Sequence, residues 1–218
     1  MIFNDLREFI AFLETKNQIR RITSLVSTDL EITEIADRTV KAGGPALLFE
    51  NVEGNDMPLL INLYGTHQRT AWALGVDEIS ELSERVKNLL NMIQEPPQGI
   101  VDKVRAAGEL LGVARAQPKL VQNGPCQEVV LTGEKVDLNR MPVLKCWPGD
   151  GGPFITLPLV ISRDPITGHR NVGTYRMQVY DRQTTGMHWQ THKVGAQHYR
   201  VSEEIKEPRL EVAVALGG

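Results

Sequence analysis

Residues 171–195 read NVGTYRMQVYDRQTTGMHWQTHKVG and concentrate amide, guanidinium, imidazole and aromatic side chains in a short span. Residues 171–180 are rich in β-branched and aromatic side chains and lack helical periodicity, which is typical of a strand. Residues 181–186 are polar and turn-forming, and residues 187–193 return to a strand-like pattern. We therefore expect a β-hairpin in the second half of the chain.

Side chains alternate across a strand, so the expected hairpin sorts its polar groups onto two faces. In the second run His188, Gln190 and His192 share one face, which makes that face rich in nitrogen. In the first run Asn171 and Arg176 fall on opposite faces. A site that uses both residues therefore needs a bulge, a strong twist or a ligand that curls around the strand.

Residues 146–195, which contain this hairpin, read CWPGDGGPFITLPLVISRDPITGHRNVGTYRMQVYDRQTTGMHWQTHKVG. They resemble a known family, the UbiD-type decarboxylases. Two upstream segments, DLEITEIADR (29–38) and GGPALLFENVEG (43–54), resemble the amino-terminal region of the same family. The resemblance implies a carboxy-lyase that uses prenylated flavin mononucleotide (FMN) on aromatic or α,β-unsaturated acids. By resemblance to quinone-pathway members, the expected substrate is a polyprenylated 4-hydroxybenzoate.

The resemblance also implies roles for particular residues. In the family an Asn and a His hold a divalent metal against the cofactor phosphate, and the Arg five residues after that Asn faces the substrate. Those roles fall on Asn171, His192 and Arg176, with Mn²⁺ as the expected metal and K⁺ as a further candidate. The residues expected to line the flavin are Thr174, Tyr175, Arg176, His188, Trp189, Gln190, Lys193 and Val194.

Arg176 is the expected catalytic residue. A guanidinium fork can bind a carboxylate through two parallel hydrogen bonds and so orient a substrate acid over the cofactor. Decarboxylation requires the breaking bond to lie perpendicular to an electron sink, and a fixed fork supplies that orientation. The residues alone leave structural interpretations open: a solvated Arg176, a turn-forming Asn171 and a His192 bonded to a carbonyl group.

The family needs a third metal ligand, a glutamate, and a proton-donating acid, and both are expected beyond Gly218. The chain is therefore interpreted as the amino-terminal part of such an enzyme and is expected to be inactive alone. Expected partners are an aromatic carboxylic acid, a flavin prenyltransferase that supplies the cofactor, and further copies in a homo-oligomer. The alternative is a flavin-binding or assembly module without chemistry. A flavin reductase is disfavoured because no GxGxxG follows a strand.

Composition excludes several classes of protein. The chain has 24 Lys and Arg against 27 Asp and Glu, a net charge of −3, so nucleic acid is not an expected partner. Apolar runs are far shorter than the roughly 20 residues needed to cross a bilayer, and the start does not resemble a signal peptide. We expect a cytoplasmic protein, peripheral at the membrane if its substrate is polyprenylated. Cys126 and Cys146 form no CxxC pair, and both are expected to be reduced and buried.

The expected fold class is α+β. A small N-terminal α/β domain at residues 1–117 is followed by a β-rich split-barrel flavin-binding domain at residues 118–218, truncated at its C-terminus. Apolar periodicity and a capping box at Asp5 indicate the helices of the N-terminal domain. Short strand-like runs separated by turns indicate the β-rich domain that follows it. The predicted helices are 6–13, 29–42, 66–74, 77–93 and 100–111, with a linker at 94–99. The predicted strands are 18–22, 46–49, 59–63, 127–131, 153–162, 171–180, 186–191 and 210–216.

Overall fold

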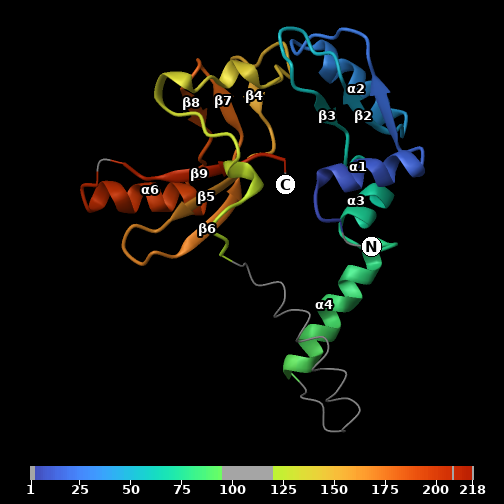
Figure 1. Ribbon diagram of the computed structural model, residues 1–218. Coiled ribbons are helices and arrows are strands. Elements are labelled where there is room, and N and C mark those ends of the chain that lie inside the picture. The colour runs from blue at the N-terminus through green and yellow to red at the C-terminus, as the bar shows by residue number, and fades with distance from the viewer. Residues whose placement is uncertain (1–2, 95–119, 208, 218) are drawn as a thin grey trace. The chain divides into compact units, whose positions relative to one another are not determined.

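The computed structural model describes residues 3–94, 120–207 and 209–217 (Figure 1). The chain divides into two compact units, a smaller one built on residues 66–133 and a larger one built on residues 3–65 and 134–218. Helices and strands both contribute, which confirms the mixed class. The predicted helix at 100–111 and most of the predicted linker lie outside the described residues.

The larger unit begins with a three-stranded sheet and two helices. The central strand, β2, is buried throughout and pairs in parallel with β1 and antiparallel with β3. Asp5 caps the first helix by accepting a hydrogen bond from the Glu8 backbone at 2.9 Å, as its sequence position predicts. Gly43, at φ +65°, follows the second helix. The elements are α1 (Leu6–Thr15), β1 (Ile19–Ile22), α2 (Glu31–Lys41), β2 (Ala46–Phe49) and β3 (Leu59–Ile61).

Residues 144–146 join the second half of the chain to this first sheet. Leu144 is buried in the same core cluster as Ile32 and Phe49. Lys145 donates a backbone hydrogen bond to Thr28 and accepts one from Leu30, each at 3.1 Å. The loop that follows, at residues 147–153, therefore starts from a fixed point.

The smaller unit contains α3 (His67–Ala73) and α4 (Ile79–Gln94), which contact each other and confirm the two helices predicted there. A short 3₁₀ helix, η1 (Pro125–Gln127), occupies the start of the strand predicted at 127–131, so that prediction is wrong. Val129 and Val130 are mostly exposed, and strand propensity has little effect without a neighbour to pack against. Cys126 is exposed, contrary to expectation, whereas Cys146 is half-buried; both are free.

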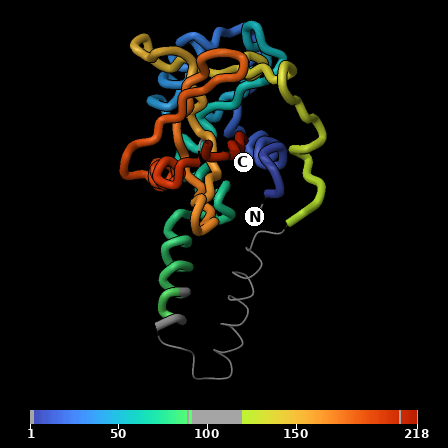
Figure 2. The backbone as a smooth tube through the Cα atoms, turned by 90° about the vertical axis from the view of Figure 1, so that its left-hand side faces the viewer, coloured from blue at the N-terminus to red at the C-terminus, as the bar shows by residue number. Residues whose placement is uncertain are grey.

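Two further three-stranded sheets complete the larger unit, ordered β4-β7-β8 and β6-β5-β9. The described strands close no barrel, so the predicted split barrel is not confirmed. The chain leaves β8, forms α6 beside β5 and β6, and returns as β9, a path that Figures 1 and 2 show. The elements are η2 (Gly133–Lys135), η3 (Leu138–Arg140), β4 (Phe154–Ile155), β5 (Leu159–Arg163), β6 (Arg170–Thr174), β7 (Met177–Val179), β8 (Thr185–Met187), α6 (Val194–Glu204) and β9 (Val212–Ala215).

The predicted strand at 171–180 is two strands in different sheets, because β6 ends at Thr174 and β7 begins at Met177. The run at 153–162 is likewise divided, with Pro158 between β4 and β5, where its missing N–H costs no ladder hydrogen bond. The predicted hairpin is confirmed for β7 and β8, with Met177 opposite Met187. Residues 188–193 do not form a strand, so the strand alternation predicted for them is wrong.

Candidate functional site

The predicted site residues gather where β6 passes into β7 and where β8 passes into α6. The backbone N–H of His188 donates to the Arg176 carbonyl at 2.9 Å, which extends the β7–β8 pairing by one position. Both runs of predicted residues therefore meet at the open end of this hairpin. The first run comprises Asn171 and Thr174 on β6 with Tyr175 and Arg176 after it. The second comprises His188, Trp189, Gln190, His192 and Lys193 after β8, with Val194 beginning α6.

Tyr175 connects β6 to the start of α6. Its side chain is buried, and its hydroxyl accepts a hydrogen bond from the Gly195 backbone at 3.1 Å. The Asn171 side-chain Nδ2 donates to the same hydroxyl at 3.3 Å. Because Gly195 lies three residues after His192, this hydroxyl places Asn171 beside the helix terminus that His192 precedes. The amide oxygen of Asn171 is then the atom that can bind a cation.

An aromatic cluster packs beside this link. The ring centroids of Tyr175 and Trp189 lie 6.2 Å apart at an interplanar angle of 75°, and Tyr199 lies 5.9 Å from Trp189. Glycine is required at 195, since a Cβ there would lie 2.9 Å from Trp189 Nε1. That Nε1 is itself buried and has no hydrogen-bond partner among the described residues. Burying a donor without a partner costs free energy.

Arg176 is held by two residues that the sequence did not single out. Its Nη2 donates to Asp150 Oδ2 at 2.7 Å, and its Cζ lies 3.6 Å from the centroid of the Phe154 ring. The hydrogen bond from Arg176 is the main cause of a lowered pKa at Asp150, and the Trp147 and Cys146 backbone N–H groups lower this pKa further. The only signal in the sequence was a carboxylate inside the glycine-rich loop at 149–152.

A buried polar pair anchors α6 to the sheet beneath it. Ser162 on β5 and His198 on α6 are 2% and 5% exposed, and Ser162 Oγ lies 3.0 Å from His198 Nδ1. A buried hydroxyl and imidazole satisfy each other in this way, so α6 is held at its middle as well as at Gly195. The helix that begins at Val194, directly after Lys193, is therefore fixed at two points.

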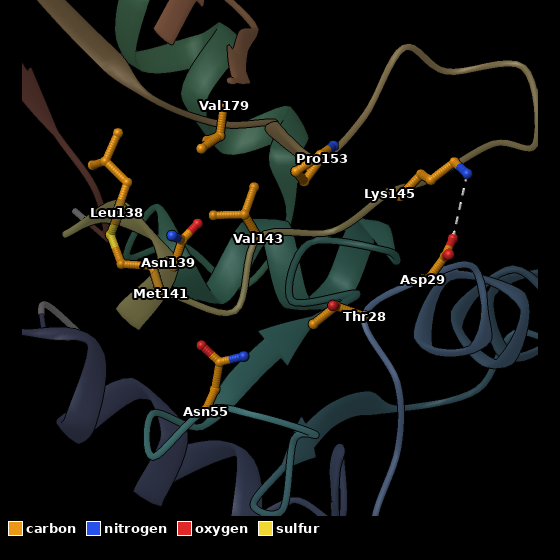
Figure 3. Close-up of a pocket in the computed structure, with 10 residues that line it drawn as sticks. All are labelled: Thr28, Asp29, Asn55, Leu138, Asn139, Met141, Val143, Lys145, Pro153 and Val179. Atoms are coloured by element: carbon orange, nitrogen blue, oxygen red, sulfur yellow. Dashed lines mark ion pairs between the residues drawn. The ribbon is translucent and has the colours of Figure 1, made fainter. Parts of the chain in front are cut away.

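A pocket of about 290 Å³ lies elsewhere in the larger unit (Figure 3). Thr28 and Asn55 line one side of it and Val143 and Val179 the other, near the Asp29–Lys145 ion pair, which measures 3.6 Å. No predicted site residue lines this pocket, so it is separate from the candidate site.

Nowhere in residues 3–94, 120–207 or 209–217 do three or more His, Cys, Asp or Glu side chains come together as a metal site would require. Within the same ranges, no helix is both long and apolar enough to cross a membrane.

Solved structures resemble this chain over nearly its whole length. The UbiD-class enzyme HmfF from Pelotomaculum thermopropionicum, in complex with FMN, aligns with a TM-score of 0.75 at 29% identity, over 98% of this chain and 42% of that one. An evolved dimeric form of HmfF in complex with prFMN aligns at 0.76 and 28% identity, over 99% and 44%. The closed form of vanillic acid decarboxylase from Sedimentibacter hydroxybenzoicus aligns at 0.79 and 25% identity, over 100% and 44%.

Curated relatives match at higher identity. A protein of Archaeoglobus fulgidus described as uncharacterized is 48% identical over 217 residues, which is 100% of this chain and 44% of the relative. An uncharacterized protein of Synechocystis sp. is 46% identical over 214 residues, 98% of this chain and 42% of the relative. The chain thus spans less than half the length of these relatives.

Two family models cover most of the sequence. Residues 10–89 match the 3-octaprenyl-4-hydroxybenzoate carboxy-lyase N-terminal domain, and residues 119–218 match the Rift-related domain of the same carboxy-lyase. The N-terminal domain precedes the Rift-related domain along the chain, and the similar structures include those of UbiD-class enzymes. The chain therefore belongs to the UbiD family of decarboxylases.

Proposed function

We propose that this chain contributes the flavin- and metal-binding part of a non-oxidative decarboxylase of aromatic or α,β-unsaturated acids. The observation that carries the proposal is the Tyr175 hydroxyl, which joins Asn171 to the N-terminus of α6 beside His192. Two predicted metal ligands from separate runs of sequence are thereby drawn to one helix end. The similarity to structures that contain FMN or prFMN supports the same conclusion.

The side chains present fit a metal and a flavin phosphate. An amide oxygen from Asn171 and an imidazole nitrogen from His192 are donors that suit Mn²⁺. The ammonium group of Lys193 suits a phosphate, and the N-terminus of α6, which follows Lys193, adds partial positive charge.

The chemistry then divides between cofactor and chain. Prenylated FMN supplies the electron sink when it is bound. Arg176 binds the substrate carboxylate and fixes its orientation, and the guanidinium fork allows this through paired hydrogen bonds. Among the remaining predicted residues, Thr174, His188 and Gln190 are exposed and available for contact with the flavin. Tyr175 is buried with its hydroxyl engaged, so its contribution would come from its backbone.

A polyprenylated 4-hydroxybenzoate is the proposed substrate within this class. The matched family models describe a 3-octaprenyl-4-hydroxybenzoate carboxy-lyase, and a similar structure is a decarboxylase of vanillic acid, which is also a phenolic acid. We further propose that a flavin prenyltransferase supplies the cofactor and that the full protein is a homo-oligomer.

Cofactor retention tests the proposal directly. The experiment uses a polypeptide of the relatives' full length that contains this chain, supplied with prenylated FMN and Mn²⁺. His192→Ala should lose both bound metal and metal-dependent flavin, measured by elemental analysis and flavin absorbance. His169→Ala, an exposed histidine in the β5–β6 turn, is the matched control and should retain both. Unchanged metal and flavin in the His192 variant, or no carbon dioxide released from any phenolic or cinnamic acid, would contradict the proposal.

A further inference from the structure

Two residues of the loop at 150–154 contact the Arg176 guanidinium. Asp150 accepts a hydrogen bond from Arg176 Nη2 at 2.7 Å, and Phe154, four residues later, places its ring 3.6 Å from Arg176 Cζ. Phe154 is fixed by pairing with Gln178 on β7. Gly152 has φ +155°, a conformation that residues with a side chain rarely adopt. Both ends of this loop therefore contact one guanidinium.

Asp150 is the more deeply placed member of the ion pair. Its side chain is 12% exposed, whereas that of Arg176 is 37% exposed. The backbone N–H groups of Cys146 and Trp147 also lower the pKa of this carboxylate. Those two residues follow Lys145, whose backbone is hydrogen-bonded to Thr28 and Leu30, just before α2. Asp150 is thus an inner, anchored group, and Arg176 extends from it toward solvent.

Two interpretations of this contact make opposite predictions. A carboxylate beside Arg176 could occupy the position of a substrate carboxylate and compete with it. Alternatively, it could hold one edge of the guanidinium and leave the other edge for the substrate. The second interpretation fits better, because Asp150 uses one of five N–H donors of the guanidinium. Displacing Asp150 from Arg176 would also leave a largely buried carboxylate without its cationic partner, which costs free energy.

We propose that Asp150 is a positioning residue that, with Phe154, fixes the plane of the Arg176 guanidinium and directs its outer edge toward a substrate carboxylate. The statement about substrate rests on the proposed function, whereas the fixing of the guanidinium does not. Because the pair is already charge-balanced, the outer edge selects a carboxylate by directed hydrogen bonds more than by net charge. A monocarboxylate is the ligand that this arrangement suits.

Order at the guanidinium tests the positioning role. In a ¹⁵N-labelled chain, the Arg176 Nε–Hε resonance is assigned by its absence from Arg176→Lys. It should show the heteronuclear NOE of a rigid group in the wild type, and a much lower value in Asp150→Ala. Asp150→Asn keeps an acceptor oxygen and should restore part of the rigidity, which a general loss of folding would not allow. Glu34→Gln, which removes the same charge from the exposed Glu34–Arg38 pair, is the control and should leave the resonance unchanged.

Benzoate, a minimal aromatic monocarboxylate, separates positioning from competition. Titration followed by NMR shifts should show binding that weakens about 10-fold in Asp150→Asn, the effect expected when a charge-assisted hydrogen bond no longer orients the fork. Tighter benzoate binding in that variant would overturn the proposal, because it would show that Asp150 competes. An Arg176 resonance equally rigid in Asp150→Ala would overturn it as well. Absence of benzoate binding from the wild type would count against the proposed function instead, and the rigidity measurement would still decide the role of Asp150.

Discussion

Tyr175 occupies an unusual position for a buried aromatic residue, because its ring and its hydroxyl serve different elements. The ring belongs to the core cluster with Val160 and Met177. The hydroxyl accepts from the Gly195 backbone and from Asn171, and so links α6 with β6. Packing and link can therefore be separated by removing one oxygen atom.

Tyr175→Phe should keep the packing and break the link. The Gly195 N–H would remain buried without an acceptor, so we expect a loss of about 1–3 kcal/mol in the free energy of unfolding. Urea denaturation monitored by tryptophan fluorescence measures it. The matched control is Tyr180→Phe, where the side chain is 61% exposed and the change should be near zero. Equal stability of both variants would mean that the Tyr175 hydroxyl does not hold α6 in place.

The site could be predicted only in part at the level of single residues. The family resemblance pointed to Asn171, His192 and Arg176, and their assigned roles remain predictions. The role of Asp150 could not be predicted from the sequence, because it depends on a contact with Arg176, which lies 26 positions away. Within its own loop it is one polar residue among glycines and indicates only a turn.

The elements show why prediction succeeded in one part of the chain and failed in another. α1 and α2 were found because each carries apolar side chains at helical spacing. α6 was missed because its buried face consists of Gly195, Ala196, His198 and Ser202, which are small or polar. The division of the predicted strand at 171–180 was missed because it depends on which sheet each half joins, and local pattern does not encode this.

The turn between β5 and β6 should have a stability that depends on pH. The Asp164 carboxylate accepts from the backbone of Thr167 at 2.8 Å and of Ile166 at 2.9 Å, and these hydrogen bonds, Thr167 first, lower its pKa. A carboxylate with a lowered folded-state pKa stabilises the protein above its unfolded pKa of about 3.9. That contribution is lost as pH falls through the folded-state pKa.

Asp164→Ala should therefore be less stable than the wild type at pH 7, and the difference should shrink as the pH is lowered below about 4. Urea midpoints measured from pH 7 to pH 2.5 test this. Asp164→Asn is the control, because its amide oxygen can accept the same two hydrogen bonds but does not titrate. The difference between Asp164→Asn and Asp164→Ala should stay nearly constant with pH. A wild-type advantage over Asp164→Ala that persists unchanged at pH 2.5 would rule out this role for the carboxylate.

At the scale of the larger unit, the sheet β6-β5-β9 is covered on one face and open on the other. Ser162 faces α6, as its contact with His198 shows. Alternation then places Leu159, Ile161 and Val172 on the opposite face, where Leu159 is 41% and Val172 55% exposed. β9 is exposed at all four positions and is an edge strand among the described residues. We call the surface of Leu159, Ile161 and Val172 the open sheet face. The sequence predicted a strand at 210–216, but it could not predict that this strand, β9, pairs with β5.

The open sheet face should make this chain self-associate, because an apolar patch beside an unpaired edge strand favours contact with another copy. We expect a concentration-dependent rise in the sedimentation coefficient of the 218-residue chain between about 5 and 200 μM, the range in which weak contacts form. Val172→Lys places a charge at the centre of the face and should abolish most of that rise. Ile166→Lys makes a comparable change at a 68% exposed residue in the β5–β6 turn, away from the face, and should leave the rise intact. Equal association of the two variants would show that another surface is responsible, and a wild type that stays monomeric throughout would show that the edge of β9 and its neighbouring face are too small to bind a second copy.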